Sequence, residues 1–289
     1  MPKIPKKGTF DKKLLSLSIV KENIRLSYWI DELLSKGKTS FTTSQLKDYY
    51  VRLSDVAIKR SLDRLVEKQK IVSLSKGYYI IVPPQYYSRG ILPPPLFIDG
   101  LMQYLERPYY VGLLNAAAFY GAAHQQPQEY FVFTDFPVIK PTKKKNLKIN
   151  YISRKKINEN ILEKRNTESG YLKISSPELT AIDLIQFEKR IGGLNRATTV
   201  LDELVESVRP EMINEELLSE VSVTAIQRLG FLLEKELSKK EIADHLFEQS
   251  KKAGLSFFRI PLKLSETTKG FHSDERWKVI VNTEIEIDE

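Results

Sequence analysis

The chain has 289 residues, of which 42% are hydrophobic and 28% charged, a composition typical of folded proteins. It contains no cysteine, which excludes disulfides, thiolate metal sites and thiol chemistry. No apolar run is long enough to span a membrane and no signal-like leader opens the chain, so we expect a cytoplasmic protein without a membrane partner.

The net charge of +8 is unevenly distributed. Residues 1–82 carry +9, residues 83–165 carry +6, and residues 166–289 carry −7. Such a gradient favours a front half that binds a polyanion, joined to a part with another task. The alternative is chance composition together with a basic tail.

The first 82 residues predict a winged helix-turn-helix domain. Residues 1–17 are interpreted as a basic flexible arm, and hydrophobic spacing predicts a helix over 18–35 that ends at Gly37. Hydroxyl residues that can cap a helix open a second helix over 42–50. A third helix follows over 54–69, and IVSL, a turn at SKG and YYIIV then predict a β-hairpin. Three helices followed by a two-stranded wing give a winged helix over residues 18–82.

The third helix predicts a reading face for DNA. Ile58, Leu62 and Leu65 form its core stripe, so Arg60 and Arg64 lie on the opposite face. Arginine matches the O6 and N7 acceptors of guanine, and a valine can meet a thymine methyl group. Lysine and hydroxyl side chains around them are suited to phosphates. The candidate DNA-binding residues are Lys38, Thr43, Ser54, Val56, Lys59, Arg60, Arg64 and Lys76. The alternatives are a protein-binding winged helix and an arginine pair that is only solvated.

The remaining chain predicts a larger mixed α/β domain after a boundary. Residues 83–95 hold five of the fourteen prolines and are interpreted as a linker, so the second domain spans 96–289. We expect a buried helix over 109–121 and the fold class α+β. Strands are expected over 129–136, 147–153 and 170–175, helices over 177–189, 211–220, 223–237 and 239–253, and strand-like ends over 255–262 and 277–288.

A second candidate basic patch lies in KPTKKKNLKINYISRKK, residues 140–156, which contains eight basic residues and no acidic residue. It is either a solvated hairpin loop or a second contact to a polyanion. Its candidate residues are Lys143, Lys144, Lys145, Lys148, Arg154, Lys155 and Lys156.

No motif predicts catalysis, a metal or a cofactor. His124, His245 and His272 lack ligand spacing, and no P-loop, dinucleotide-binding or nucleophile-elbow motif is present. The carboxylates of Asp183 and Glu188 are similar to a nuclease set only in composition, and the C-terminal EIEIDE is better interpreted as a solvated acidic edge. We therefore expect a protein that is not an enzyme and has no cofactor.

Four segments resemble the AbiEi family of antitoxins and transcriptional regulators from abortive-infection (type IV) toxin–antitoxin systems. They are GYYIIVPPQYY, YYVGLLNAAAFYG, EYFVFTDF and YLKISSPELTAIDLIQF. The last contains a strand followed by Ser176, Pro177 and Glu178, and then Asp183 and Leu184. The resemblance covers about residues 18–260, and its motifs are diffuse.

The resemblance implies two tasks. The winged helix is expected to bind inverted repeats of double-stranded DNA upstream of its own operon and repress it. The larger domain is expected to counteract a nucleotidyltransferase-like cognate toxin without forming a stable complex with it.

Two alternatives stay open from the residues alone. One is a winged-helix repressor whose C-terminal domain senses a ligand in a pocket formed by residues 109–121 and the following strands. The other is a nuclease or nucleotidyltransferase tethered to DNA, in which Asp183 or Asp288 is required for metal-dependent turnover.

Overall fold

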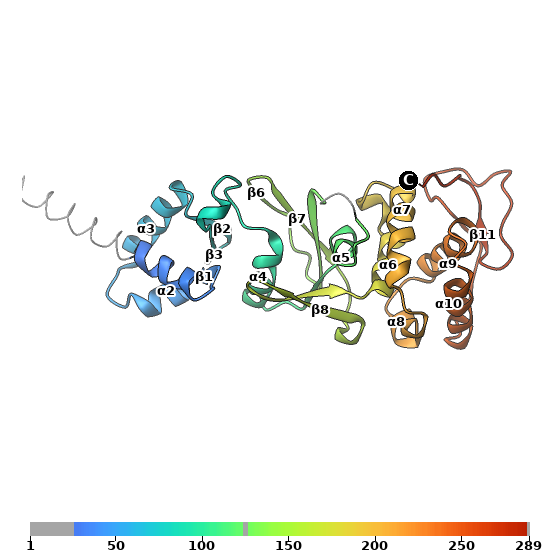
Figure 1. The fold of residues 1–289 in the computed structure, drawn as a ribbon, viewed down its shortest axis with the longest axis horizontal. Helices are drawn as coiled ribbons and strands as arrows, with labels where there is room; N and C mark the ends of the chain where they lie inside the picture. The colour runs from blue at the N-terminus through green and yellow to red at the C-terminus, as the bar shows by residue number, and fades with distance from the viewer. Residues whose placement is uncertain (1–25, 124–126, 288–289) are drawn as a thin grey trace, which may run out of the picture. The chain divides into compact units, whose positions relative to one another are not determined.

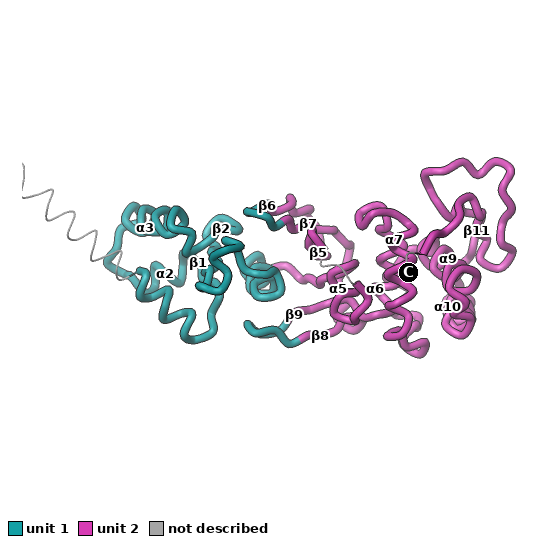
Figure 2. The backbone as a smooth tube through the Cα atoms, turned by 45° about the horizontal axis from the view of Figure 1, so that its top comes forward, with its two compact units in different colours: residues 1–106, 143–147, 166–171 teal, residues 107–142, 148–165, 172–289 magenta. Residues whose placement is uncertain are grey.

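The structure, a computed structural model, describes residues 26–123 and 127–287. It divides into two compact units (Figure 2), the first comprising residues 1–106, 143–147 and 166–171 and the second comprising residues 107–142, 148–165 and 172–289. The predicted arm, His124 and Asp288 lie outside the described residues.

The first unit begins with the elements expected of a winged helix (Figure 1). A helix described over residues 26–35 is followed by two short helices and a three-stranded antiparallel sheet of order β1-β3-β2. The elements are β1 Ser40–Thr42, α2 Thr43–Tyr49, α3 Asp55–Glu67, β2 Ile71–Ser75 and β3 Tyr78–Ile81. Strand β1 was not predicted, because three residues between two helices give no periodic signal.

Local capping explains why the two short helices begin where they do. Thr42 Oγ1 accepts a hydrogen bond from the Gln45 amide, and Gln45 Oε1 accepts one from the Thr42 amide, which forms a capping box. Ser54 caps α3 by accepting from the Ala57 amide at 3.2 Å. The predicted stripe of Ile58, Leu62 and Leu65 is buried, and packs in one cluster with residues of helix 26–35 and the sheet.

Proline-rich residues 83–95 pack onto the first unit's own elements. They contain the 3-10 turn Pro84–Tyr86 and lead into a second, Pro94–Leu96, while Ile91 and Leu92 are buried. Helix α4 Ile98–Tyr104 follows. The Leu96 carbonyl accepts hydrogen bonds from Thr39 Oγ1 at 2.9 Å and Ser169 Oγ at 2.8 Å, which fixes this segment beside β1.

A mixed sheet runs through the larger part of the fold in the order β6-β7-β5-β4-β9-β8. Strands β4 and β5 pair antiparallel, whereas β5 with β7 and β4 with β9 pair parallel. The strands are β4 Tyr109–Val111, β5 Glu129–Thr134, β6 Thr142–Lys144, β7 Leu147–Ser153, β8 Leu162–Thr167 and β9 Gly170–Ser175. The predicted strands at 147–153 and 170–175 coincide with β7 and β9.

The prediction of one helix over 109–121 is wrong. Residues Tyr109–Val111 form β4, and only α5 Leu114–Phe119 is helical. Two features break the helix between them: Leu113 has φ 57°, and Gly112 is so close to Phe133 that a Cβ there would lie 2.5 Å from its ring. The aromatic and β-branched residues before Gly112 then favour a strand.

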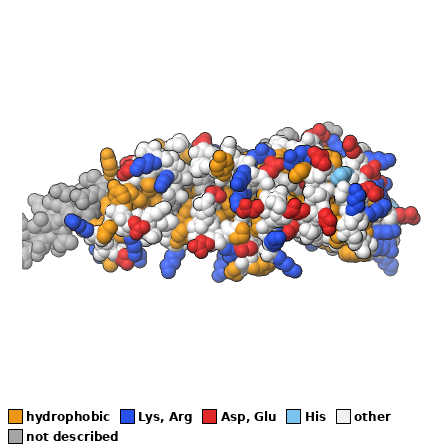
Figure 3. Space-filling view, turned by 90° about the horizontal axis from the view of Figure 1, so that it is seen from below, with side chains coloured by type: hydrophobic (Ala, Val, Ile, Leu, Met, Phe, Trp, Pro, Cys, Tyr) orange, Lys and Arg blue, Asp and Glu red, His pale blue; other side chains and the backbone are white. Residues whose placement is uncertain are grey.

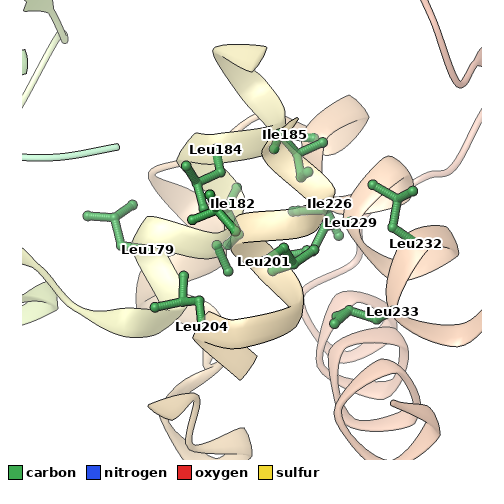
Figure 4. Packing of buried hydrophobic residues seen from close by; sticks show 14 of the residues in the cluster. Leu179, Ile182, Leu184, Ile185, Leu201, Leu204, Ile226, Leu229, Leu232 and Leu233 are labelled. Carbon is green, nitrogen blue, oxygen red and sulfur yellow. The ribbon is translucent and has the colours of Figure 1, made fainter. Parts of the chain in front are cut away.

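Helices form the core of the second unit beside its sheet. Figure 4 shows Leu179, Ile182 and Ile185 of α6 packed with leucine and isoleucine side chains of α7, α9 and the π-helical turn after α9. The elements are α6 Pro177–Gln186, α7 Leu194–Leu204, α8 Glu215–Ser219, α9 Val223–Phe231, the π-helical turn Leu232–Glu236 and α10 Lys240–Lys252. Within the segments predicted as strand-like, 255–262 and 277–288, the structure has the short parallel pair β10 Ile260–Pro261 and β11 Val279–Ile280.

One buried ion pair connects the sheet to these helices. Asp183 of α6 has no exposed surface, and its carboxylate accepts hydrogen bonds from the Arg154 guanidinium and, at 2.9 Å, from the Tyr110 hydroxyl. Arg154 also donates to the Glu220 carbonyl at 2.8 Å and lies over the Tyr110 and Phe133 rings. Burial raises the pKa of Asp183, and the guanidinium and the hydroxyl oppose this shift by stabilising the carboxylate.

We predict that Asp183→Ala lowers the free energy of unfolding by about 3–5 kcal/mol, because it leaves the Arg154 charge buried without its partner. Tyr110→Phe removes one neutral donor and is expected to cost about 1–3 kcal/mol. Urea unfolding of both variants measures the difference. A smaller loss for Asp183→Ala than for Tyr110→Phe would contradict a central role for the ion pair.

Candidate nucleic-acid interface

Helix α3 presents a basic face to solvent opposite its buried stripe. Val56 is 60% exposed, Lys59 and Arg60 are exposed, and Arg64 is half-buried. Within the described part of the chain, no ion pair neutralises Lys59, Arg60 or Arg64. These cations are therefore free to meet phosphates or base edges.

The acidic residue at the start of α3 is neutralised. Asp55 lies in the first helical turn, where a carboxylate favours the positive end of the helix dipole, and it pairs with Lys47 of α2 at 2.7 Å. Both side chains are exposed, so this pair contributes little to stability. It does reduce the repulsion that Asp55 exerts on an approaching phosphate.

Two hydroxyl residues predicted as phosphate contacts already have structural tasks. Ser54 Oγ is the acceptor of the α3 cap, and Thr43 Oγ1 donates to the Gly77 carbonyl at 3.3 Å. Lys38 is exposed just before β1. A phosphate contact from Ser54 would use its hydroxyl proton, which the cap leaves available.

The turn between β2 and β3 is fixed from two sides. The Thr43 amide donates to the Gly77 carbonyl at 2.8 Å, and the Tyr104 hydroxyl of α4 donates to the Lys76 carbonyl at 2.8 Å. Gly77 has φ 80°, a conformation that glycine adopts without strain. The exposed Lys76 side chain therefore extends from a well-anchored backbone. Sequence reasoning missed the contribution of Tyr104, since nothing in its surroundings marks a contact with residue 76.

The structure divides the second basic patch. Lys143, Lys144 and Lys145 are exposed and belong to the first unit, whereas Lys155 and Lys156 are exposed in the second. The other two members are used inside the second unit: Lys148 pairs with Glu129 at 2.6 Å, and Arg154 is only 11% exposed beside Asp183. We therefore remove Arg154 from the candidate surface, because its charge is required by a buried carboxylate.

The surface carries both signs of charge. On the face seen in Figure 3, Lys and Arg side chains are interspersed with Asp and Glu side chains. Net charge alone therefore does not locate the candidate DNA contacts, which depend on particular residues on α3 and the β2–β3 turn.

The carboxylates considered for catalysis are buried in ion pairs. Asp183 is held by Arg154 and Tyr110, and Glu188 lies 3.6 Å from Arg228 with both side chains buried. Across residues 26–123 and 127–287, no group of three or more His, Asp or Glu side chains is arranged to hold a metal ion. This part of the chain therefore offers no metal site of the kind that the enzyme alternative requires.

A cavity of about 370 Å³ lies beside α5, as the ligand-sensing alternative requires. Leu114, Phe131, Arg190 and Arg196 are among its lining residues. Its polar lining includes two arginines, but among the described residues that line it no buried side-chain polar atom lacks a partner, so this lining does not specify a ligand.

Comparison with known proteins identifies the class of the second unit. Residues 110–235 match the AbiEi antitoxin C-terminal domain family. A solved structure, the RV2827C protein from Mycobacterium tuberculosis, is similar with a TM-score of 0.61 at 15% sequence identity, and the match covers 88% of this chain and 90% of that one. At this identity the similarity shows a shared fold. A search of curated proteins gave no match.

The chain thus combines an α+β fold with the C-terminal domain of an antitoxin. The domain match over residues 110–235 supports an AbiEi family antitoxin. This domain supports an antitoxin role in a type IV toxin–antitoxin system. None of the helices described here has the length and apolar character needed to cross a membrane.

We predict that Ser54→Ala lowers the free energy of unfolding by about 1 kcal/mol, because the Ala57 amide loses its acceptor. Ser54→Asp keeps a cap acceptor and is expected to retain stability, while its negative charge weakens binding to DNA. Thermal unfolding and DNA titration of both variants separate the cap from the contact. Equal DNA affinity for the wild type and Ser54→Asp would place residue 54 away from phosphates.

Proposed function

We propose that the protein is a DNA-binding autorepressor and antitoxin of a type IV toxin–antitoxin system. The observation that supports the DNA half is the basic face of α3, whose cations have no ion-pair partner among residues 26–123 and 127–287, together with the anchored β2–β3 turn. The antitoxin half is supported by the domain match over residues 110–235.

The dimensions of α3 suit a major groove. Its 13 residues make a rod about 20 Å long, and the groove is about 12 Å wide and admits one helix. Arg60 and Arg64 on its outer side would read guanine, and Val56 would contact a thymine methyl group. Lys38, Lys59 and Lys76 would hold the phosphates and set the register. The target would be inverted repeats upstream of its own operon.

The second unit would relieve toxicity through a different surface. We propose that it counteracts a nucleotidyltransferase-like toxin without a stable complex and without catalysis of its own. The buried state of Asp183 and Glu188 supports this, since neither carboxylate can reach a substrate or a metal ion.

The first experiment measures binding of the full chain to its own upstream DNA and to a scrambled duplex across a salt series. Tighter binding to the upstream fragment with a steep salt dependence supports the autorepressor. Equal, weak binding to both fragments would reject it and leave only general affinity for polyanions.

We predict that Arg60→Ala costs about 1–3 kcal/mol on the upstream site and relaxes its sequence preference. The matched control is Lys76→Ala, which should weaken binding to both fragments alike and lower the salt slope by about 1. Fluorescence anisotropy on both fragments compares the two variants. If Arg60→Ala lowers the affinity for upstream and scrambled DNA equally, α3 does not read sequence through this residue.

We predict that the chain with Arg60→Ala and Lys76→Ala still rescues growth when toxin and antitoxin are expressed from constitutive promoters. The reason is that rescue would reside in the second unit, whereas the two substitutions affect only DNA. The control is Asp183→Ala, which should lose rescue through unfolding of that unit. Loss of rescue in the DNA-binding variant at equal protein level would show that the two tasks are not separable.

A further inference from the structure

The β6–β7 hairpin carries three consecutive lysines on a tight turn. Strand β6 ends at Lys144 and β7 begins at Leu147, so Lys145 and Asn146 form a two-residue connection. Lys145 has φ 52°, the left-handed conformation that two-residue hairpin turns use. Strands β6 and β7 are hydrogen-bonded neighbours, so the ladder positions the backbone of Lys143 and Lys144, with Lys145 on the tight turn beside them.

The turn lies at the C-terminal end of α3. Residues 143–147 belong to the first unit, although the rest of β7 belongs to the second. A Cβ at Gly90 would lie 3.6 Å from Lys145 Cε and also 3.6 Å from Gln69 Oε1. Lys145 and Gln69 thus flank the same glycine, and Gln69 directly follows Lys68, the residue that caps α3.

Further cations are sequence neighbours of Gln69 and Gly90. Lys68, Lys70 and Arg89 come from the end of α3 and from the residue before Gly90. Among the described residues, no acidic side chain pairs with these three cations or with Lys143, Lys144 and Lys145. Lys148, four residues after Lys144, shows the contrast, since Glu129 neutralises it.

We propose that Lys143, Lys144 and Lys145 bind phosphates of the same DNA duplex that α3 enters, which extends the footprint past the end of that helix. This inference rests on the proposed DNA-binding function. A helix about 20 Å long exceeds the groove width of about 12 Å, so groups at its ends lie close to the bordering phosphates. The contact is electrostatic and independent of sequence, since lysine on a turn offers a point charge without a base-reading fork.

The test is the variant Lys143→Gln, Lys144→Gln and Lys145→Gln in the full chain. Its affinity for the upstream fragment and for the scrambled duplex is measured from about 50 to 200 mM salt. Each lost phosphate contact lowers the slope of log affinity against log salt by about 0.9, so we expect a decrease of about 2–3. The preference for the upstream fragment should stay unchanged.

Two control variants make the result specific. The first control carries Lys189→Gln, Lys240→Gln and Lys252→Gln together. It removes the same charge from exposed lysines of the second unit that have no ion-pair partner among the described residues, and it should keep the wild-type salt slope. The second control carries Lys143→Arg, Lys144→Arg and Lys145→Arg together. It retains the positive charge and should also keep the wild-type salt slope. Thermal unfolding confirms that all three variants are folded.

The outcomes separate this inference from the function on which it rests. The inference is overturned if the glutamine variant of Lys143–Lys145 keeps the wild-type salt slope. It is also overturned if the second-unit control lowers the salt slope equally. Neither result bears on the reading role of Arg60. Failure of the wild type to prefer the upstream fragment would instead reject the proposed function, and the second contact with it.

Discussion

The ion pair between Arg154 and Asp183 is the interaction on which the second unit depends. Three elements distant in sequence meet there, since Tyr110 comes from β4, Arg154 directly follows β7 and Asp183 lies in α6. A charge pair with this burial needs further hydrogen bonds, and here the Asp183 carboxylate accepts one from the Tyr110 hydroxyl while Arg154 Nη1 donates one to the Glu220 carbonyl. Burial and mutual pairing keep both side chains from chemistry at the surface, so Asp183, the carboxylate considered for a nuclease, supports the packing inside the second unit.

The first unit holds α3, the helix proposed to read DNA, against a small core. Its helices are short, so the caps at Thr42 and Ser54 contribute strongly to fixing where α2 and α3 begin. The β2–β3 turn is fixed by Thr43 from one side and Tyr104 from the other. A turn held in this way loses little conformational entropy when a phosphate binds Lys76, because the backbone is already ordered.

Elements with a local sequence signal were predicted from the sequence. The predictions were wrong where contacts between residues distant in sequence determine the structure. The Ser54 cap, the stripe on α3 and strands β7 and β9 follow from residue types at fixed spacing. The break at Gly112 depends on Phe133, some twenty residues away, and the burial of Arg154 depends on Asp183, so neither is visible in a local pattern. For the candidate DNA-binding residues, the structure adds exposure and partners, while their assignment to bases and phosphates stays a prediction. The domain boundaries drawn from the prolines also stay a prediction.

Formal charge and available charge differ along this chain, and the difference bears on function. Residues 83–165 carry a net +6, and three of their cations, Arg107, Lys148 and Arg154, are paired. Their partners Asp135 and Glu129 are already counted in that sum, whereas Asp183 lies outside the segment. Lys143, Lys144 and Lys145 remain exposed, on a turn that belongs to the first unit. Since counterion release depends on cations that can reach phosphates, the polyanion affinity that the sequence distributes over two segments is expected to concentrate in the first unit. The second unit also has exposed lysines such as Lys155 and Lys156, but residues 166–289 carry a net −7, so we expect it to attract DNA less than the first unit does.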